Sequence, residues 1–259
     1  MYLNSTGENA NQLDWNHVLY ELEDFLGGHS AIGNLLMRAV GELCSNPQVM
    51  ANIQEEIDRT TGGNSRPVTL EDRPNMPYTE AAILETLRLS SSPIVPHVAM
   101  QDTSVAGKHY STFHFSQKLK LKRNANRLFI VWILFIKFNQ SIGYDVKEGT
   151  MVFLNNYELN ISADYWERPL AFDPSRFIRR GAIVKPEYFI PFSTGKRACM
   201  GYRLVQHVSF VALAALLQNF DVSPVSKEFP RSSIDLPKAC VAVHPDAFHV
   251  QLTPRRFAS

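Results

Sequence analysis

The chain has few cysteines and no long hydrophobic run, and each shortage excludes a class of protein. Three cysteines in 259 residues cannot form the dense disulfide framework of a small secreted domain, which fits a reducing compartment or the cytosolic face of a membrane. No run of about 18 or more apolar residues is present and the first residues are polar, so we predict no membrane anchor in this sequence. The remaining composition, 45% hydrophobic and 20% charged, is typical of a globular core of one or two domains.

Acidic residues are missing from one segment, residues 108–143, which carries seven Lys or Arg and no Asp or Glu. Removing its seven positive charges would change the formal net charge from +1 to −6. Within it, residues 128–136 form an apolar run that is rich in β-formers and too short to span a membrane as a helix. The segment therefore differs in composition from the rest of the chain, and its exposed apolar run would favour aggregation.

Three interpretations of residues 108–143 compete. A basic and aromatic stretch can bind nucleic acid or a membrane surface, but this one has no regular amphipathic face and no known motif, so we predict neither partner. A lineage-specific loop is the second interpretation. Our hypothesis is an insertion of translated non-coding sequence, such as a retained intron. Its removal would join Thr103–Gly107 directly to Tyr144–Val146 as a strand, turn and strand.

The most informative motif surrounds Cys199. Gly195 and Gly201 on either side permit a tight or closely approached backbone, and Lys196 and Arg197 bring positive charge. The apolar pattern after residue 200 predicts a helix, which places Cys199 near the positive end of a helix dipole and favours an anionic sulfur. This environment predicts a thiolate ligand to haem iron. Cys44 and Cys240 lack such surroundings, and we interpret them as small buried hydrophobes.

A second motif is the pair Glu85 and Arg88 in the amphipathic stretch 78–89. The spacing of three residues places both on one helical face, close enough for an ion pair. Most such pairs are solvated surface bridges that contribute about 0–1 kcal/mol. The segment 166–177, which contains Arg176, changes that interpretation once it is compared with a known family.

Together these motifs resemble the cytochrome P450 family. The signature Phe-x-x-Gly-x-Arg-x-Cys-x-Gly is complete at residues 192–201, the Glu-x-x-Arg pair lies at 85–88, and residues 166–177 resemble the segment whose arginine joins that pair. The resemblance implies a mainly α fold with small β-sheets. Because family members are considerably longer, we expect residues 1–259 to be a partial P450 domain without its N-terminal half, a fragment or truncated product.

The resemblance also implies roles for individual residues. Cys199 would be the axial ligand of haem b (iron protoporphyrin IX), and Glu85, Arg88 and Arg176 would form a buried structural cluster. Breaking such a cluster costs about 3–5 kcal/mol because one charge is left uncompensated. The other members of the signature would serve the cofactor as follows: Arg197 binds a propionate, Gly195 shapes the loop, Gly201 lets the helix pass near the ring, and Phe192 packs beside the sulfur.

The strand-like run Pro93–Ala99 lies where P450s line the substrate pocket. His97 is the candidate for a second propionate contact, and an ordinary surface histidine is an equally open interpretation. Ile94 and Val95 would face the substrate, as would the C-terminal hairpin near Ala239–Val243.

A long helix is predicted from Leu13 to Cys44, in the place of the central P450 helix, and the next helix from Asn46 and Pro47 to Gly62. The oxygen-activation motif of the family, Ala/Gly-Gly-x-Asp/Glu-Thr, is altered here to the sequence that runs from Gly27 through Gly28, His29 and Ser30 to Ala31. Serine replaces the acid and alanine the threonine, so proton delivery would need Ser30 or His29 through water. A polar residue in a helix groove is the competing interpretation of His29.

Residues 25–34 and 153–160 resemble the Spook/Spookier branch of insect P450s, the Halloween class implicated in ecdysteroid synthesis. The resemblance implies a monooxygenase that oxidises a sterol-like precursor with dioxygen and with electrons from NADPH through cytochrome P450 reductase. The reductase would dock near Lys196, Arg197 and Arg203, and the full-length protein would lie on the cytosolic face of the endoplasmic reticulum membrane. Two alternatives stay open: a thiolate-haem isomerase or dehydratase that needs no external electrons, and a non-catalytic truncated or degenerate product.

Overall fold

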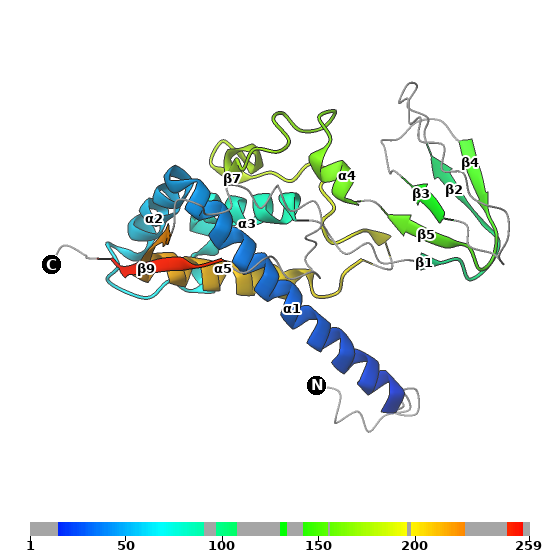
Figure 1. The fold of residues 1–259 in the computed structure, drawn as a ribbon, viewed down its shortest axis with the longest axis horizontal. Helices are drawn as coiled ribbons and strands as arrows, with labels where there is room; N and C mark the ends of the chain where they lie inside the picture. The colour runs from blue at the N-terminus through cyan, green and yellow to red at the C-terminus, as the bar shows by residue number, and fades with distance from the viewer. Residues whose placement is uncertain are drawn as a thin grey trace.

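The computed structural model describes residues 15–90, 97–107, 130–133, 142–154, 156–195, 198–225 and 248–255. Over this part of the chain the fold is mainly helical with small β-sheets, as predicted, and the sheets β1–β5 lie to one side of the helices (Figure 1). The helices are α1 (Trp15–Ser45), α2 (Pro47–Thr61), η2 (Leu70–Asn75), α3 (Pro77–Leu89), α4 (Asn156–Ile161), η3 (Pro174–Phe177) and α5 (Tyr202–Asn219). The strands are β1 (His97–Val98), β2 (Thr103–Gly107), β3 (Ile130–Ile133), β4 (Ile142–Val146), β5 (Met151–Leu154), β6 (Ile178–Arg179), β7 (Ala182–Ile183), β8 (Phe220–Pro224) and β9 (Val250–Pro254).

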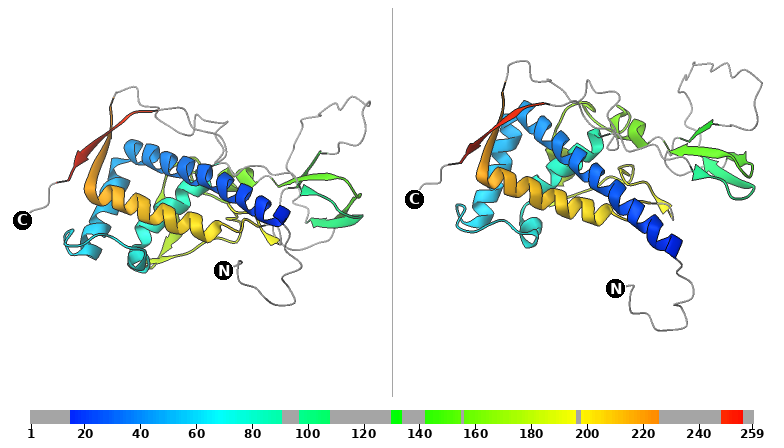
Figure 2. Two further views of the ribbon diagram at one scale, coloured as in Figure 1. Left: turned by 90° about the horizontal axis from the view of Figure 1, so that it is seen from below. Right: turned by 60° about the horizontal axis from the view of Figure 1, so that its bottom comes forward.

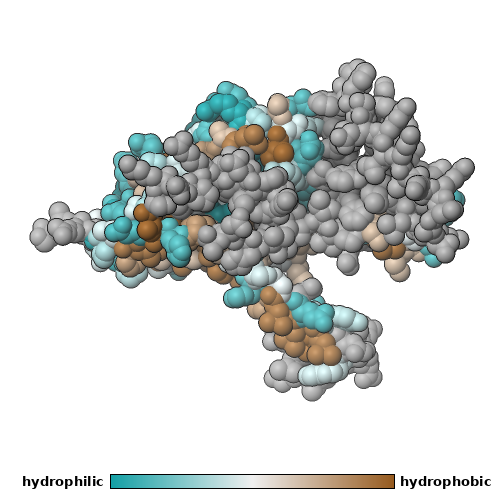
Figure 3. All heavy atoms as spheres, viewed as in Figure 1, coloured by the Kyte–Doolittle hydropathy of each residue, from teal (hydrophilic) through white to brown (hydrophobic). Residues whose placement is uncertain are grey.

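Helix α1 confirms the predicted long helix, and its two halves have different surroundings. In the C-terminal half, Leu35, Ala39 and Leu43 are buried in the core that α2, α3 and α5 share. In the N-terminal half the large apolar side chains are exposed, with 74% of Phe25 and of Leu26 open to solvent. This end of α1 projects from the body of the molecule and carries much of the hydrophobic surface seen in Figure 3.

Helix α2 begins and ends where the sequence predicts. Pro47 is its first residue, and Gly62 ends it with a φ of +68°, a left-handed conformation that suits glycine. Asn46 is the N-cap residue, but its side chain makes no cap hydrogen bond to α2. The Asn46 amide instead donates to the Glu42 carbonyl oxygen at the end of α1, at 2.8 Å.

Helix α3 lies at the centre of the helical body. Every side chain from Ala81 to Leu89 is buried, and α1, α2, α5 and η3 all pack against this helix. An aromatic group that contains Trp166, Phe177 and Phe189 belongs to the same core, with ring centroids 4.8–6.2 Å apart. Helices α1 and α5 run side by side across this body in both views of Figure 2.

The strands on either side of the 108–143 segment pair with each other. In the antiparallel pair β2–β4, Val105 lies opposite Tyr144 and Gly107 lies opposite Ile142. Strand β3, which lies within the segment, pairs in parallel with β5 as the third strand of the sheet β1-β5-β3. The two flanks of the segment are therefore held together in space, as a strand, turn and strand requires.

Among the helices that the structure describes, none combines the length and the apolar character that crossing a bilayer requires.

Candidate functional site

The loop before α5 is a closed turn that ends in Cys199. The Cys199 N–H donates to the Phe192 carbonyl oxygen at 2.9 Å, and the Ala198 N–H donates to the Gly195 carbonyl oxygen at 3.2 Å. Gly195 has a φ of +75°, a conformation that a side chain would strain. The glycine of the motif thus permits the turn, and the backbone bond to Phe192 fixes where the cysteine lies.

The cysteine lies directly against the first turn of α5. A Cβ atom added to Gly201 would lie 3.9 Å from the Cys199 Sγ atom, so the sulfur is in van der Waals range of the residue that precedes the helix. The N–H groups in the first turn of a helix carry partial positive charge. Cys199 itself is exposed, so its sulfur is open to a ligand.

Several apolar side chains that follow Cys199 in the chain are exposed. Met200 is 70% exposed, and Leu204 and Val208, each four residues further along α5, are 48% and 39% exposed. The projecting half of α1 exposes a similar set, which includes Val18, Leu22, Phe25 and Leu26. An open thiol beside uncovered hydrophobic surface is suited to a flat, largely apolar cofactor.

The same loop contains one polar group that lacks a partner among the described residues. The described part of the chain contains no cluster of three or more His, Cys, Asp or Glu that could hold a bare metal ion. The hydroxyl of Ser193, in the same loop, is buried and makes no hydrogen bond within the described residues. Ser193 also has a φ of +64°, so this segment is held in a costly conformation next to the cysteine.

The structure brings Glu85, Arg88 and Arg176 together in one buried cluster. Arg88 Nε donates to Glu85 Oε2 and Arg88 Nη2 donates to Glu85 Oε1, both at 2.8 Å, and Arg176 Nε reaches Glu85 Oε1 at 2.9 Å. The side chains of Glu85 and Arg88 are 0% exposed and that of Arg176 is 10% exposed. The Oε1 atom also accepts the Asp173 N–H at 2.9 Å, so each carboxylate oxygen accepts at least one hydrogen bond.

The rest of this cluster consists of backbone carbonyls and one indole ring that sequence reasoning missed. Arg88 Nη1 donates to the carbonyl oxygens of Asn160 and Pro169, both at 2.6 Å. The ring of Trp166 lies beneath both guanidinium groups, 5.1 Å from the Arg88 Cζ atom and 5.7 Å from that of Arg176. Trp166 is the first residue of the 166–177 segment, and its position there was the sequence feature that could have predicted this contact.

The altered oxygen-activation motif lies on the projecting half of α1. His29 and Ser30 are exposed, and the Ser30 hydroxyl donates to the Gly27 carbonyl oxygen at 3.0 Å. A Cβ atom added to Gly27 or Gly28 would meet nothing within 4 Å, so the helix face there is open. The Ser30 proton is thus engaged with the backbone of its own helix in this structure.

Of the remaining predicted positions, the structure describes His97. His97 is half-buried in β1, opposite Val152 of β5. Ile94, Val95 and Arg197 lie outside the described residues, as do Lys196 and residues 239–243. Their predicted contacts with propionate, substrate and reductase stay predictions.

Arg38 of α1 is a buried charge that sequence reasoning missed. Its guanidinium donates to the Leu89 carbonyl oxygen at 3.0 Å and so ties α1 to the C-terminal end of α3. Burial lowers the pKa of Arg38, while Glu42 and Tyr157 act in the opposite direction. The bond anchors α1 two turns beyond the altered motif.

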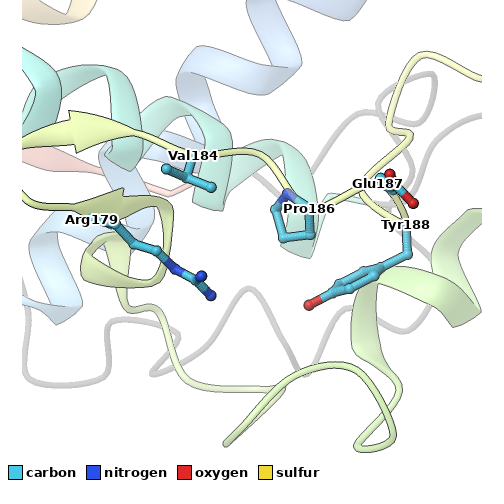
Figure 4. A pocket seen from close by; sticks show the side chains of 5 residues that line it. All are labelled: Arg179, Val184, Pro186, Glu187 and Tyr188. Atoms are coloured by element: carbon cyan, nitrogen blue, oxygen red, sulfur yellow. The ribbon is translucent and has the colours of Figure 1, made fainter.

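A hollow of about 340 Å³ lies between the β6–β7 hairpin and the segment Pro186–Tyr188 (Figure 4). The side chains of Arg179 and Tyr188 point toward this space. None of the residues that line it belongs to a predicted site, so it is separate from the cysteine loop.

Comparison with known proteins bears on the whole chain. A sequence model described as cytochrome P450 matches residues 1–112 and 136–252. Cytochrome P450 307a1 of Drosophila melanogaster is 34% identical over 263 residues, which cover 93% of this chain and 41% of that protein. Cytochrome P450 2J5 of Mus musculus is 32% identical over 213 residues, covering 82% of this chain and 36% of that protein. The steroid 17-alpha-hydroxylase/17,20 lyase of Oryzias latipes is 30% identical over 246 residues, covering 92% and 40%.

The chain thus spans 36% to 41% of the length of these relatives.

Proposed function

Because the chain belongs to the cytochrome P450 family, we propose that it supplies the thiolate-bearing part of a haem-thiolate monooxygenase. The observation that carries this proposal is the closed loop that presents the exposed Cys199 sulfur at the N-terminus of α5. The family's cofactor is haem b, which receives electrons from NADPH through a reductase. When bound, haem b supplies the redox-active iron that oxidises the substrate with dioxygen and two electrons.

The chain's own residues divide into a binding group and a supporting group. Cys199 would hold the iron, Gly201 would leave room for the ring, and Arg197 and His97 would bind the propionates, as the family resemblance implies. The cluster of Glu85, Arg88 and Arg176 would hold α3 and η3 in place beneath the site. Its burial, with hydrogen bonds to both oxygens of the Glu85 carboxylate, supports a structural role.

We further propose a sterol or ecdysteroid precursor as substrate. The resemblance to the insect Halloween class supports this choice, as do the match to cytochrome P450 307a1 and the steroid hydroxylase among the relatives. Ile94 and Val95 would face this substrate. NADPH-cytochrome P450 reductase would dock near Arg203, at the endoplasmic reticulum membrane.

The altered motif on α1 favours one alternative within the same family, a thiolate-haem isomerase or dehydratase that needs no external electrons. Ala31 lacks the alcohol of the usual threonine, and the Ser30 hydroxyl is engaged with Gly27. Turnover of a sterol substrate with and without NADPH and reductase distinguishes the two activities. Turnover that is independent of NADPH would favour the isomerase or dehydratase.

A non-catalytic product is the second alternative. The exposed hydrophobic half of α1 favours it, since a chain that leaves this surface uncovered does not by itself enclose an apolar cofactor.

The test of the main proposal is an absorbance spectrum of the purified chain, reconstituted with haem, reduced and exposed to carbon monoxide. We expect the red-shifted Soret band of thiolate-ligated haem in the natural chain and in Cys44→Ala, and its loss in Cys199→Ser. Cys44 is a matched control because it is a half-buried cysteine outside the loop. Absence of the band from the natural chain would favour the non-catalytic product.

We also propose that residues 108–143 are an insertion into a P450 hairpin. The pairing of β2 with β4 supports this, because excision would leave Val105 opposite Tyr144 with Ala106 and Gly107 as a two-residue loop. The family match omits residues 113–135, which lie within the segment. Sequencing the transcript tests the retained-intron hypothesis, and an mRNA that always contains the segment would defeat it.

A further inference from the structure

Tyr202, the first residue of α5, occupies a position between the cysteine loop and solvent. Its ring centroid lies 6.2 Å from that of Phe192, with the two planes tilted by 53°. Tyr202 is 40% exposed, whereas Phe192 is partly buried against the core. The Tyr202 ring therefore packs against the Phe192 ring.

Arg203 holds the Tyr202 ring from the solvent side. The Arg203 Nε atom donates to the Tyr202 hydroxyl oxygen at 2.9 Å, and the Arg203 Cζ atom lies 5.6 Å from the ring centroid. Both contacts restrict the motion of a ring that is otherwise half in water. Arg203 thus limits the orientations that Tyr202 can adopt against Phe192.

Phe192 connects this pair to the sulfur through its backbone. The Phe192 carbonyl oxygen accepts the Cys199 N–H at 2.9 Å, the hydrogen bond that closes the loop. The next residue, Ser193, has a φ of +64° and a buried hydroxyl without a partner among the described residues, so this segment is strained. A strained segment keeps its conformation only where its neighbours hold it.

We infer that Tyr202 is a positioning residue for the thiolate. By packing against Phe192 it keeps the Phe192 carbonyl on the Cys199 N–H, and so keeps the sulfur at the N-terminus of α5. The inference rests on the proposed function for its consequence, which is that the iron–sulfur bond persists when the iron is reduced. The positioning itself is a property of the haem-free chain.

The first experiment measures hydrogen exchange of the Cys199 amide in the haem-free full chain, by mass spectrometry of overlapping peptides. We expect Tyr202→Ala to speed this exchange by about 3- to 10-fold, the loss that one aromatic pair produces. Tyr202→Phe keeps the ring contact and should exchange within about twofold of the natural chain. Leu204→Ala is the matched control, since Leu204 is an exposed apolar residue of the same helical turn.

The second experiment records the carbon monoxide spectrum of Tyr202→Ala and Tyr202→Phe after haem reconstitution. We expect Tyr202→Ala to convert part of the red-shifted band to the form that has lost thiolate ligation, and Tyr202→Phe to restore the natural spectrum. Equal Cys199 exchange in Tyr202→Ala, Leu204→Ala and the natural chain would overturn the inference, as would equal acceleration by Tyr202→Ala and Tyr202→Phe. If the natural chain gives no haem band, the proposed function fails, while the exchange measurement still decides the role of Tyr202.

Discussion

The cluster around Glu85 and the loop around Cys199 differ in burial and in how far their polar groups find hydrogen-bond partners within this chain. Glu85 and Arg88 are fully buried, and every oxygen of the carboxylate accepts hydrogen bonds from groups of the same chain. Cys199 is exposed, beside exposed apolar residues such as Met200 and Leu204 and one buried hydroxyl without a described partner, that of Ser193. The two regions therefore differ in role. A buried, hydrogen-bonded cluster stabilises the fold, whereas an exposed cysteine is available to a ligand.

We expect the largest loss of stability from Glu85→Gln. The substitution removes the charge that two buried guanidinium groups share, and it should lower the free energy of unfolding by about 3–5 kcal/mol. Urea unfolding followed by circular dichroism measures the change. Glu55→Gln, on the exposed face of α2, is the control and should change stability by less than about 0.5 kcal/mol. A loss at Glu85 no greater than at Glu55 would show that the cluster is not a structural centre.

An acid titration tests the ion pair of Arg66 with Asp72, whose burial is intermediate between that of the Glu85 cluster and that of the Cys199 loop. The Arg66 guanidinium, 2.6 Å from Asp72, lowers the pKa of that carboxyl to about 2, with help from the Thr69 N–H. A folded-state pKa below the unfolded value of about 4 adds stability above pH 4, and this stability is lost as the pH falls toward 2.

Because Arg66 is 47% exposed, solvent screening reduces this contribution to about 1 kcal/mol. Urea unfolding at a series of pH values from about 6 to 2 measures the slope, relative to the Asp72→Asn variant in which it should be smaller. Equal slopes in the two proteins would contradict the assignment to Asp72.

A stabilising change is expected within the cysteine loop. Ser193→Gly removes both the positive-φ strain and the buried hydroxyl, and should raise the free energy of unfolding by up to about 1 kcal/mol despite the added chain entropy. Ser193→Ala removes only the hydroxyl and should stabilise less. Thermal melts of the three proteins rank them, and a destabilised Ser193→Gly would mean that the hydroxyl has a structural partner.

The smallest effect on stability is expected at the residue with the greatest expected effect on function. Cys199→Ser is a nearly isosteric change at an exposed residue, and the free energy of unfolding should change by less than about 0.5 kcal/mol. The same variant should lose the thiolate spectrum entirely. A loss of several kcal/mol in the haem-free chain would show that Cys199 is structural and would remove the contrast with Glu85.

Local patterns predicted the helices well. The apolar period placed α1 within two residues of its observed ends, and Asn46, Pro47 and Gly62 marked the limits of α2. Such features depend on neighbours a few residues apart, which is the range over which sequence periodicity is informative. The Asn46 side chain donates to the Glu42 carbonyl oxygen of the preceding helix and does not bond to α2, a contact that the local pattern does not specify.

Contacts between residues far apart in the sequence were harder to predict. The pairing of Arg88 with Glu85 follows from their spacing, whereas the contact of Arg176 with Glu85 was expected only from the resemblance to a known family. Neither route predicted that Trp166 lies beneath both guanidinium groups or that Arg38 binds the Leu89 carbonyl oxygen. These contacts join segments between 10 and more than 70 residues apart, for which periodicity carries no information.

By itself, the sequence determined the helices, the cysteine motif and the family, since these depend on residue identity and on short spacing. Only the tertiary structure decided which of the motifs are enclosed. It buried Glu85 against segments distant in the chain, and it left Cys199 and the N-terminal half of α1 exposed. Burial depends on which surfaces meet in space. The apolar residues along α1 follow one helical pattern, both in the half whose side chains meet the core and in the half whose side chains are exposed to water.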